Sequence, residues 1–129
     1  MSVLSAGLTQ PKNSISIIRG SSKTYALAVT DKNGEPVDLT GSRVIFSVKA
    51  TFCEEDALIR KDSANGTTEI EITNALGGLA DIKMVPSDTN TMNAGEYVFD
   101  VWVILSSGKQ YPVIPPSKLL VEPGVTVFP

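Results

Sequence analysis

The sequence predicts an all-β domain, built as an antiparallel β-sandwich of about seven to eight strands with one short helical turn. Three observations carry this prediction. Apolar and polar residues alternate with the period of two that is typical of strands. Turn signals rich in Gly, Asn and Pro recur roughly every 8 to 12 residues. No amphipathic segment is long enough for the helix of a βαβ unit, so a parallel α/β sheet is not expected.

The totals fit one domain with a substantial core. The chain has 129 residues, of which 42% are hydrophobic and 19% charged. That length leaves no room for two domains, and that composition is not typical of disorder. We expect the sandwich over residues 14–122, an N-terminal arm over residues 1–13 and a C-terminal arm over residues 123–129.

The first half of the chain predicts short strands separated by tight turns. Asn33-Gly34 and Asn65-Gly66 mark turns because both residue types tolerate positive φ. Glu54, Glu55 and Asp56 form a further polar turn. The strands are expected at 14–19, 23–30, 43–52 and 57–61, with a short extended piece at 36–39.

The second half continues the pattern, and it contains one helical segment at 86–92, where Pro86 suits the first helical position. Ser106 to Lys109 is expected to form a hairpin turn. Pro115 and Pro116 are expected to break the last strand. The strands are predicted at 68–73, 79–85, 96–105 and 110–114, the last resuming at 118–121.

Trp102 is out of phase with the core-facing residues of its strand, which are Tyr97, Phe99 and Val101. Because aromatic side chains bury a large area, we expect Trp102 in the core. A position facing a partner is the alternative.

Charge and hydropathy argue against two classes of partner. The net charge is −3 and the eleven basic residues are scattered, so no phosphate-binding surface for nucleic acid is expected. The longest apolar run, 101–105, is far below the roughly 20 residues that cross a bilayer, and the N-terminus does not resemble a signal peptide. We therefore expect neither nucleic-acid nor membrane partners.

Residues for catalysis or cofactor binding are scarce. The chain has no histidine and a single cysteine, Cys53, so no intrachain disulfide forms and no imidazole can activate the thiol. The acidic run Glu54 to Asp56 lacks a calcium-loop pattern; we interpret it as a solvated turn, with divalent-cation binding as the alternative. We predict no enzymatic activity, no catalytic residue, no metal site and no cofactor.

The two predicted arms carry the candidate partner-binding residues. Frayed tails are the simpler interpretation. The alternative is that the arms add to a neighbour's surface or sheet edge. On that alternative the contact residues are Leu4, Leu8, Val125, Val127 and Phe128.

Several short motifs follow one another in a recognisable order. Residues 20–41 read GSSKTYALAVTDKNGEPVDLTG, and the later segments are VIFSV at 44–48, DALIRK at 56–61, EIT at 71–73, GLADI at 78–82, PSDT at 86–89 and AGEYVFDV at 94–101. A Ser107-Gly108-Lys109 hairpin and a final strand complete the series. Over roughly residues 15–122 it resembles the immunoglobulin-like domain of tailed-bacteriophage structural proteins, and it is similar to the N-terminal domain of phage upper baseplate proteins.

The resemblance implies an immunoglobulin-like fold and a structural role in a virion, made in the cytoplasm of the host bacterium. On this interpretation the chain is an assembly module of the tail or baseplate that docks on other virion proteins, as a homo-oligomer or in symmetric copies. Two alternatives remain open, a capsid decoration (cement) protein and a carbohydrate-binding module on the virion surface. The sugar-binding alternative needs an exposed aromatic platform, for which the candidates are Trp102, Tyr111 and Tyr25.

Overall fold

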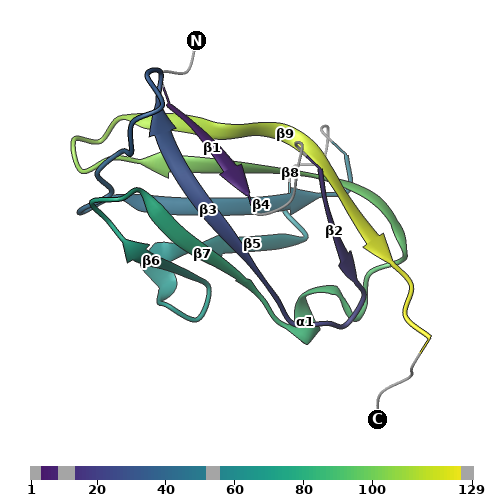
Figure 1. Cartoon of the computed structure of the whole chain (residues 1–129). Helices are drawn as coiled ribbons and strands as arrows, with labels where there is room; N and C mark the ends of the chain where they lie inside the picture. Colours follow the sequence, from purple (N-terminus) through teal and green to yellow (C-terminus); the bar gives the residue numbers. More distant parts are fainter. Residues whose placement is uncertain (1–3, 9–13, 52–55, 126–129) are drawn as a thin grey trace.

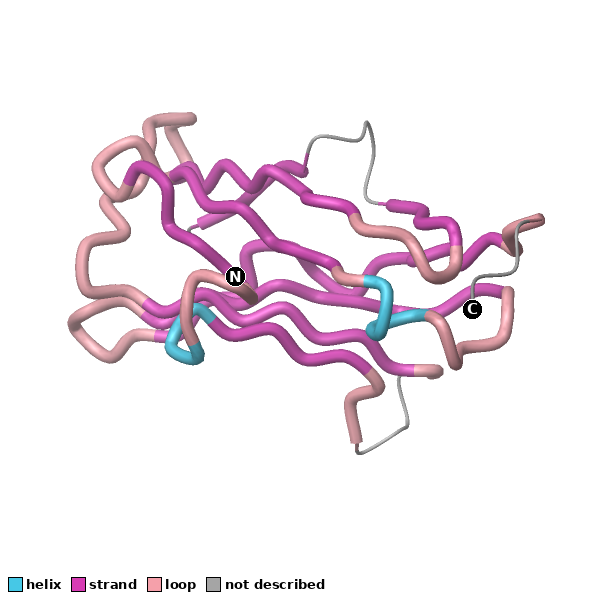
Figure 2. Tube along the Cα trace, turned by 90° about the horizontal axis from the view of Figure 1, so that it is seen from below, coloured by secondary structure: helices cyan, strands magenta, loops and turns pink. Residues whose placement is uncertain are grey.

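Two β-sheets pack face to face in the computed structural model, which describes residues 4–8, 14–51 and 56–125 (Figure 1). Seen from below, the strands are extended tubes with only two short helical turns among them (Figure 2). The strands are β1 (Leu4–Leu8), β2 (Ser14–Ile18), β3 (Lys23–Asp31), β4 (Arg43–Lys49), β5 (Ile59–Asp62), β6 (Ile70–Asn74), β7 (Leu79–Met84), β8 (Gly95–Ile104) and β9 (Gln110–Glu122).

The four-stranded sheet has the order β1-β3-β7-β6, and the five-stranded sheet has the order β2-β9-β8-β4-β5. The neighbouring strands pair antiparallel except β2 and β9, which run parallel. The order of the strands in the two sheets is that of an immunoglobulin domain, with β1, β3, β7 and β6 in the places of its ABED sheet. The predicted fold class is confirmed.

The core lies between the sheets and is formed by the alternate residues that the period of two selects. On β4 these are Val44, Phe46 and Val48, and all three are fully buried. Phe46 meets Phe99 of β8 with ring centroids 5.7 Å apart, within the range of favourable aromatic pairs. Because adjacent residues on a strand point to opposite faces, this burial also fixes which side chains face outward.

Two short helical turns join strands at the rim. The four-residue helix α1 (Pro86–Thr89) begins with the expected proline, and the Val85 amide donates to Asp88 at 2.8 Å. Lys61 points from β5 into the interior and binds the Asp88 carboxylate at 2.8 Å, which ties α1 to the five-stranded sheet. The 3₁₀ turn η1 (Ser63–Asn65) follows β5 directly.

The expectation that residues 1–13 lie outside the sandwich is wrong for residues 4–8. They form β1, which pairs antiparallel with β3 from Leu4↔Asp31 to Leu8↔Leu27. Their alternation is too short to stand out in the sequence, whereas β3 offers an edge whose amides and carbonyls need partners. The structure thus adds one strand to those that the sequence predicts.

Pro115 and Pro116 do not break the last strand, because β9 runs without interruption from Gln110 to Glu122. The β8–β9 ladder shifts register on both sides of Val101, and the shift between Phe99 and Val101 lies opposite the two prolines. Strand β2 pairs with β9 only from Lys118 onward. A bulge next to an edge tolerates residues that have no amide hydrogen to donate, so the strand continues.

Candidate functional site

The outer face of the five-stranded sheet carries an apolar row that runs across three strands. The register pairs Ile45 of β4 with Trp102 of β8, and Trp102 in turn with Pro112 of β9. Directly opposed residues share a face, so these three side chains stand side by side on the outside. A large aromatic side chain in such a row gives the face an apolar centre.

Trp102 lies on this outer face, so its predicted core position is wrong. The residue is 37% exposed, and its indole Nε1 donates a hydrogen bond to Asp100 Oδ2 at 3.0 Å. The strand alternation outweighs the tendency of tryptophan to be buried, because Val101 and Val103 already occupy the inward positions. The hydrogen bond fixes the orientation of an indole whose face remains partly open.

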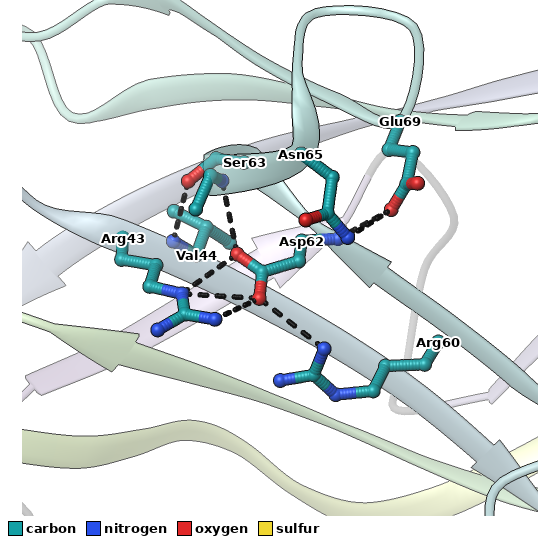
Figure 3. A network of polar contacts seen from close by, with 8 residues as sticks. Arg43, Val44, Arg60, Asp62, Ser63, Asn65 and Glu69 are labelled. Atoms are coloured by element: carbon teal, nitrogen blue, oxygen red, sulfur yellow. Dashed lines mark hydrogen bonds and ion pairs between the residues drawn. The ribbon is translucent and has the colours of Figure 1, made fainter.

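Beside this row, a buried carboxylate binds two arginines (Figure 3). Arg43 donates from Nε to Asp62 Oδ1 and Oδ2 at 2.8 and 3.0 Å and from Nη2 to Oδ2. Arg60 Nη1 lies 3.3 Å from the same Oδ2. The Asp62 side chain is 0% exposed, whereas those of Arg43 and Arg60 are 45% and 49% exposed. Two half-exposed guanidinium groups are therefore anchored to one buried anion, which we name the arginine clamp (Arg43, Arg60 and Asp62).

Local backbone geometry holds the clamp in place. Asp62 is the last residue of β5 and the N-cap of η1, so its Oδ1 accepts the Ala64 amide hydrogen at 2.9 Å. Its own amide donates to Glu69 Oε1 at 3.0 Å, and the Val44 amide donates to Ser63 Oγ at 2.9 Å. These bonds join β4, β5 and η1 around the carboxylate.

The clamp also shapes the ionisation of its members. The hydrogen bonds from Arg43 hold the pKa of the Asp62 carboxyl below its usual value, while burial acts in the opposite direction. The same hydrogen bonds raise the pKa of the Arg43 guanidinium. Asp62 is therefore charged across the physiological range, and the clamp carries two positive charges against one negative.

Shallow depressions mark the same face. One, of about 110 Å³, is lined by residues of β4, β8 and β9, namely Ser47, Lys49, Val98, Phe99, Asp100 and Pro116. A second, of about 430 Å³, continues along β8 past Val98 to Glu96 and Lys118. A third, of about 520 Å³, lies next to Arg43 but at the rim between the two sheets, where residues of η1 and β6 also line it. They are open hollows that suit protruding side chains of a partner, in contrast to the enclosed pockets that small substrates occupy.

The predicted partner-binding residues are only partly placed by the structure. Leu4 and Leu8 belong to β1, whose backbone pairs within the chain's own sheet. Val125 is almost completely exposed just beyond β9. Val127 and Phe128 lie outside the described residues. The partner-binding role of the arms stays a prediction, and the candidate site among the described residues is the sheet face.

Sequence reasoning missed Arg43 and Arg60 as site residues. The signal was their phase: Arg43 precedes the inward Val44, and Arg60 follows the inward Ile59, so both had to face outward. Nothing in the sequence showed that Asp62 would be buried between them, because that contact joins two strands.

The described part of the chain has few residues that suit metal binding or other site chemistry. No group of three or more metal-ligating side chains occurs there; Asp56 is exposed, whereas Cys53, Glu54 and Glu55 lie outside it. Tyr25 is fully buried, and burial raises the pKa of its phenol to about 12. No helix in the same part is long and apolar enough to cross a membrane.

Of the sugar-platform candidates, Tyr111 pairs with the inward Val103 and packs against the core. With Tyr25 buried as well, Trp102 alone of the three remains on the outside.

Comparisons with known proteins define the class of the molecule by its fold. CopC from Methylosinus trichosporium OB3b has a TM-score of 0.50 at 14% identity, over 95% of this chain and 99% of that one. The Lin-41 filamin domain has a TM-score of 0.50 at 14% identity, over 92% and 93%. Dimeric latent PorU from Porphyromonas gingivalis has a TM-score of 0.53 at 15% identity, and the match spans 98% of this chain but 13% of that one.

At this level of identity the likeness shows an immunoglobulin-like β-sandwich and nothing about activity. No protein-family model matches the chain, and no curated protein matches it.

Proposed function

We propose that the chain is a protein-binding assembly module that docks through the outer face of its five-stranded sheet. The observation that carries this proposal is the partly exposed row of Ile45, Trp102 and Pro112 next to two anchored arginines. Tryptophan and arginine are the side chains most enriched among residues that dominate binding energy at protein interfaces. The proposed role is binding and not catalysis.

We further propose that the module is a structural protein of a tailed-bacteriophage virion, in the tail or baseplate. The ordered series of motifs over roughly residues 15–122 supports this proposal, as does the partly exposed apolar row on one outer face of the sandwich. Repeated copies in a particle would gain avidity without any single strong contact. Capsid decoration is the alternative location for the same module.

The virion role is tested by peptide mass spectrometry and cryo-EM of purified particles from cells that encode the chain. We expect stoichiometric copies in the tail or baseplate. Copies on the capsid shell would replace that location with the decoration alternative. Absence of the chain from the particles would refute the virion role.

The docking face is tested with two matched variants. Trp102→Ser and Leu79→Ser each remove an apolar side chain of similar exposure, 37% and 41%, from opposite outer faces of the sandwich. We expect Trp102→Ser to reduce incorporation into particles about tenfold, the effect of losing about 1.4 kcal/mol of binding energy. Leu79→Ser should leave incorporation unchanged; equal effects of the two variants would contradict the proposed face.

A further inference from the structure

The arginine clamp has more hydrogen-bond donors than its carboxylate uses. A guanidinium carries five N–H donors. Among the described residues, the Arg43 donors that reach a partner are Nε and Nη2, and Arg60 makes its one contact through Nη1. Both side chains are about half exposed. Donors that Asp62 does not take therefore remain at the surface.

We propose that Arg43 and Arg60 bind a carboxylate of an acidic segment in the partner protein, and that Trp102 receives an apolar side chain of the same segment. This inference rests on the proposed protein-binding function and names the chemistry of the partner. Arginine is suited to the task because its planar fork matches a carboxylate in two-point hydrogen bonding.

Charge complementarity favours an acidic occupant. The whole chain carries −3, and the outward positions on β4, β5, β8 and β9 are balanced in charge, with Arg43, Lys49, Arg60 and Lys118 against Asp62, Glu96, Asp100 and Glu122. Glu96 already lies 3.4 Å from Lys118, and Asp100 accepts the Trp102 indole. At the clamp itself, two arginines share the single carboxylate of Asp62, so the local charge there is positive.

Pre-organisation makes the site effective. Surface arginines lose rotamer freedom when they bind, which opposes association. Here the buried Asp62 carboxylate, itself held by the Ala64 amide, restrains both side chains before a partner arrives. Removing Arg60 leaves Asp62 bound to Arg43, so the donor can be deleted without exposing an unpaired buried charge.

The sheet geometry sets the spacing that the partner must match. Asp62 is opposite Ile45, and Ile45 is opposite Trp102, so two strand spacings, about 10 Å, separate the clamp from the indole. An extended segment covers that distance in about three residues. The partner segment should therefore carry a large apolar residue about three positions from an Asp or Glu.

The experiment selects ligands from a random library of peptides of about 12 residues against the full-length chain. We expect enriched peptides that contain Asp or Glu near an aromatic or leucine residue. Their affinity is then measured by calorimetry and by the fluorescence of Trp102, the single tryptophan of the chain. Replacing the acid of the best peptide by its amide should weaken binding about tenfold or more.

Variants localise the binding. Arg60→Gln and Trp102→Ser should each weaken the best peptide about tenfold, whereas Lys32→Gln, an equal loss of charge in the exposed Asp31–Gly34 turn, should leave its affinity unchanged. Circular dichroism and the unfolding midpoint check that each variant is folded.

Three outcomes would refute the proposed site. The selection could enrich no peptide, or it could enrich peptides that lack Asp and Glu. The third outcome is that Arg60→Gln leaves the affinity for the acidic peptides unchanged. Self-association that Arg60→Gln abolishes would assign the face to a second copy of the chain. Peptides that bind elsewhere on the chain would refute this site but not the proposed protein-binding function. The detection of the chain in virus particles does not depend on any result of the peptide selection.

Discussion

Strand β5 carries Arg60, Lys61 and Asp62 in succession, and its two faces use these charges in different ways. Lys61 points inward, is 8% exposed, and satisfies its charge on Asp88 at 2.8 Å. On the outer face, one buried carboxylate holds two arginines that stay half exposed. The Lys61–Asp88 ion pair neutralises its own charges inside the fold. The outer clamp stabilises the same corner and still presents charge to the surroundings, and this is what separates a structural ion pair from a binding site.

The largest expected loss of stability follows the replacement of Asp62, the buried anion of the clamp. Asp62→Asn should lower the free energy of unfolding by about 3 kcal/mol, because the amide cannot balance two guanidinium groups. Urea denaturation followed by Trp102 fluorescence measures the loss. Asp81→Asn, on the outer face of the other sheet, is the control and should cost less than about 0.5 kcal/mol. A loss below about 1 kcal/mol for Asp62→Asn would show that the clamp does not support the fold.

The Asp62 carboxylate should make the free energy of unfolding depend on pH in the acidic range. Because the pKa of Asp62 in the folded protein lies below its ordinary value of 3.8, its contribution is fully present above 3.8. That contribution is lost as the pH falls through the folded-state pKa. We therefore expect the free energy of unfolding, measured by urea denaturation at a series of acidic pH values, to decrease more steeply with falling pH for the wild type than for Asp62→Asn. Parallel profiles for the two proteins would contradict the assignment.

The inner pair should behave differently when both partners change. Lys61→Met alone should cost about 2 kcal/mol, because it leaves the mostly buried Asp88 carboxylate without its cation. Adding Asp88→Asn keeps an acceptor for the Val85 amide and should restore stability to within about 1 kcal/mol of the wild type. A double variant as unstable as Lys61→Met would mean that the pair does more than neutralise its own charges. Thermal and urea unfolding of the three variants decide this.

The smallest expected effect on folding belongs to Arg60. Its guanidinium is 49% exposed and makes one 3.3 Å contact, so Arg60→Gln should change the unfolding free energy by less than about 0.5 kcal/mol. The same urea titration measures this change. A loss above about 2 kcal/mol would show that Arg60 has a structural role, as Lys61 does, and would contradict the difference between the two faces of β5.

Periodicity predicts most of this fold because burial enforces it. The inward residues of β4 and β7, such as Phe46 and Ile82, are where the period of two places them. The errors share a physical cause. Strand β1 and the continuous β9 depend on pairing with distant strands, and Trp102 faces outward because its register leaves no inward position.

The candidate site was less accessible to sequence reasoning than the fold. Alternation could assign Arg43 and Arg60 to an outer face, but the charge of the site is created by cross-strand contacts. Asp62 reaches Arg43 over 19 positions of the chain. Spacing in the sequence does not report such a contact, so the two arginines looked like solvated surface charges.

The start of β1 and the end of β9 lie at opposite ends of the sandwich, and β2 and β9, the second and the last strand, run parallel (Figure 1). Tension between the start of β2 and the end of β9 would act along this ladder and load its hydrogen bonds together, whereas a hairpin pulled open at one end loses them one at a time. The pairing that closes the five-stranded sheet at β2 is therefore the part of that sheet that would resist such a pull.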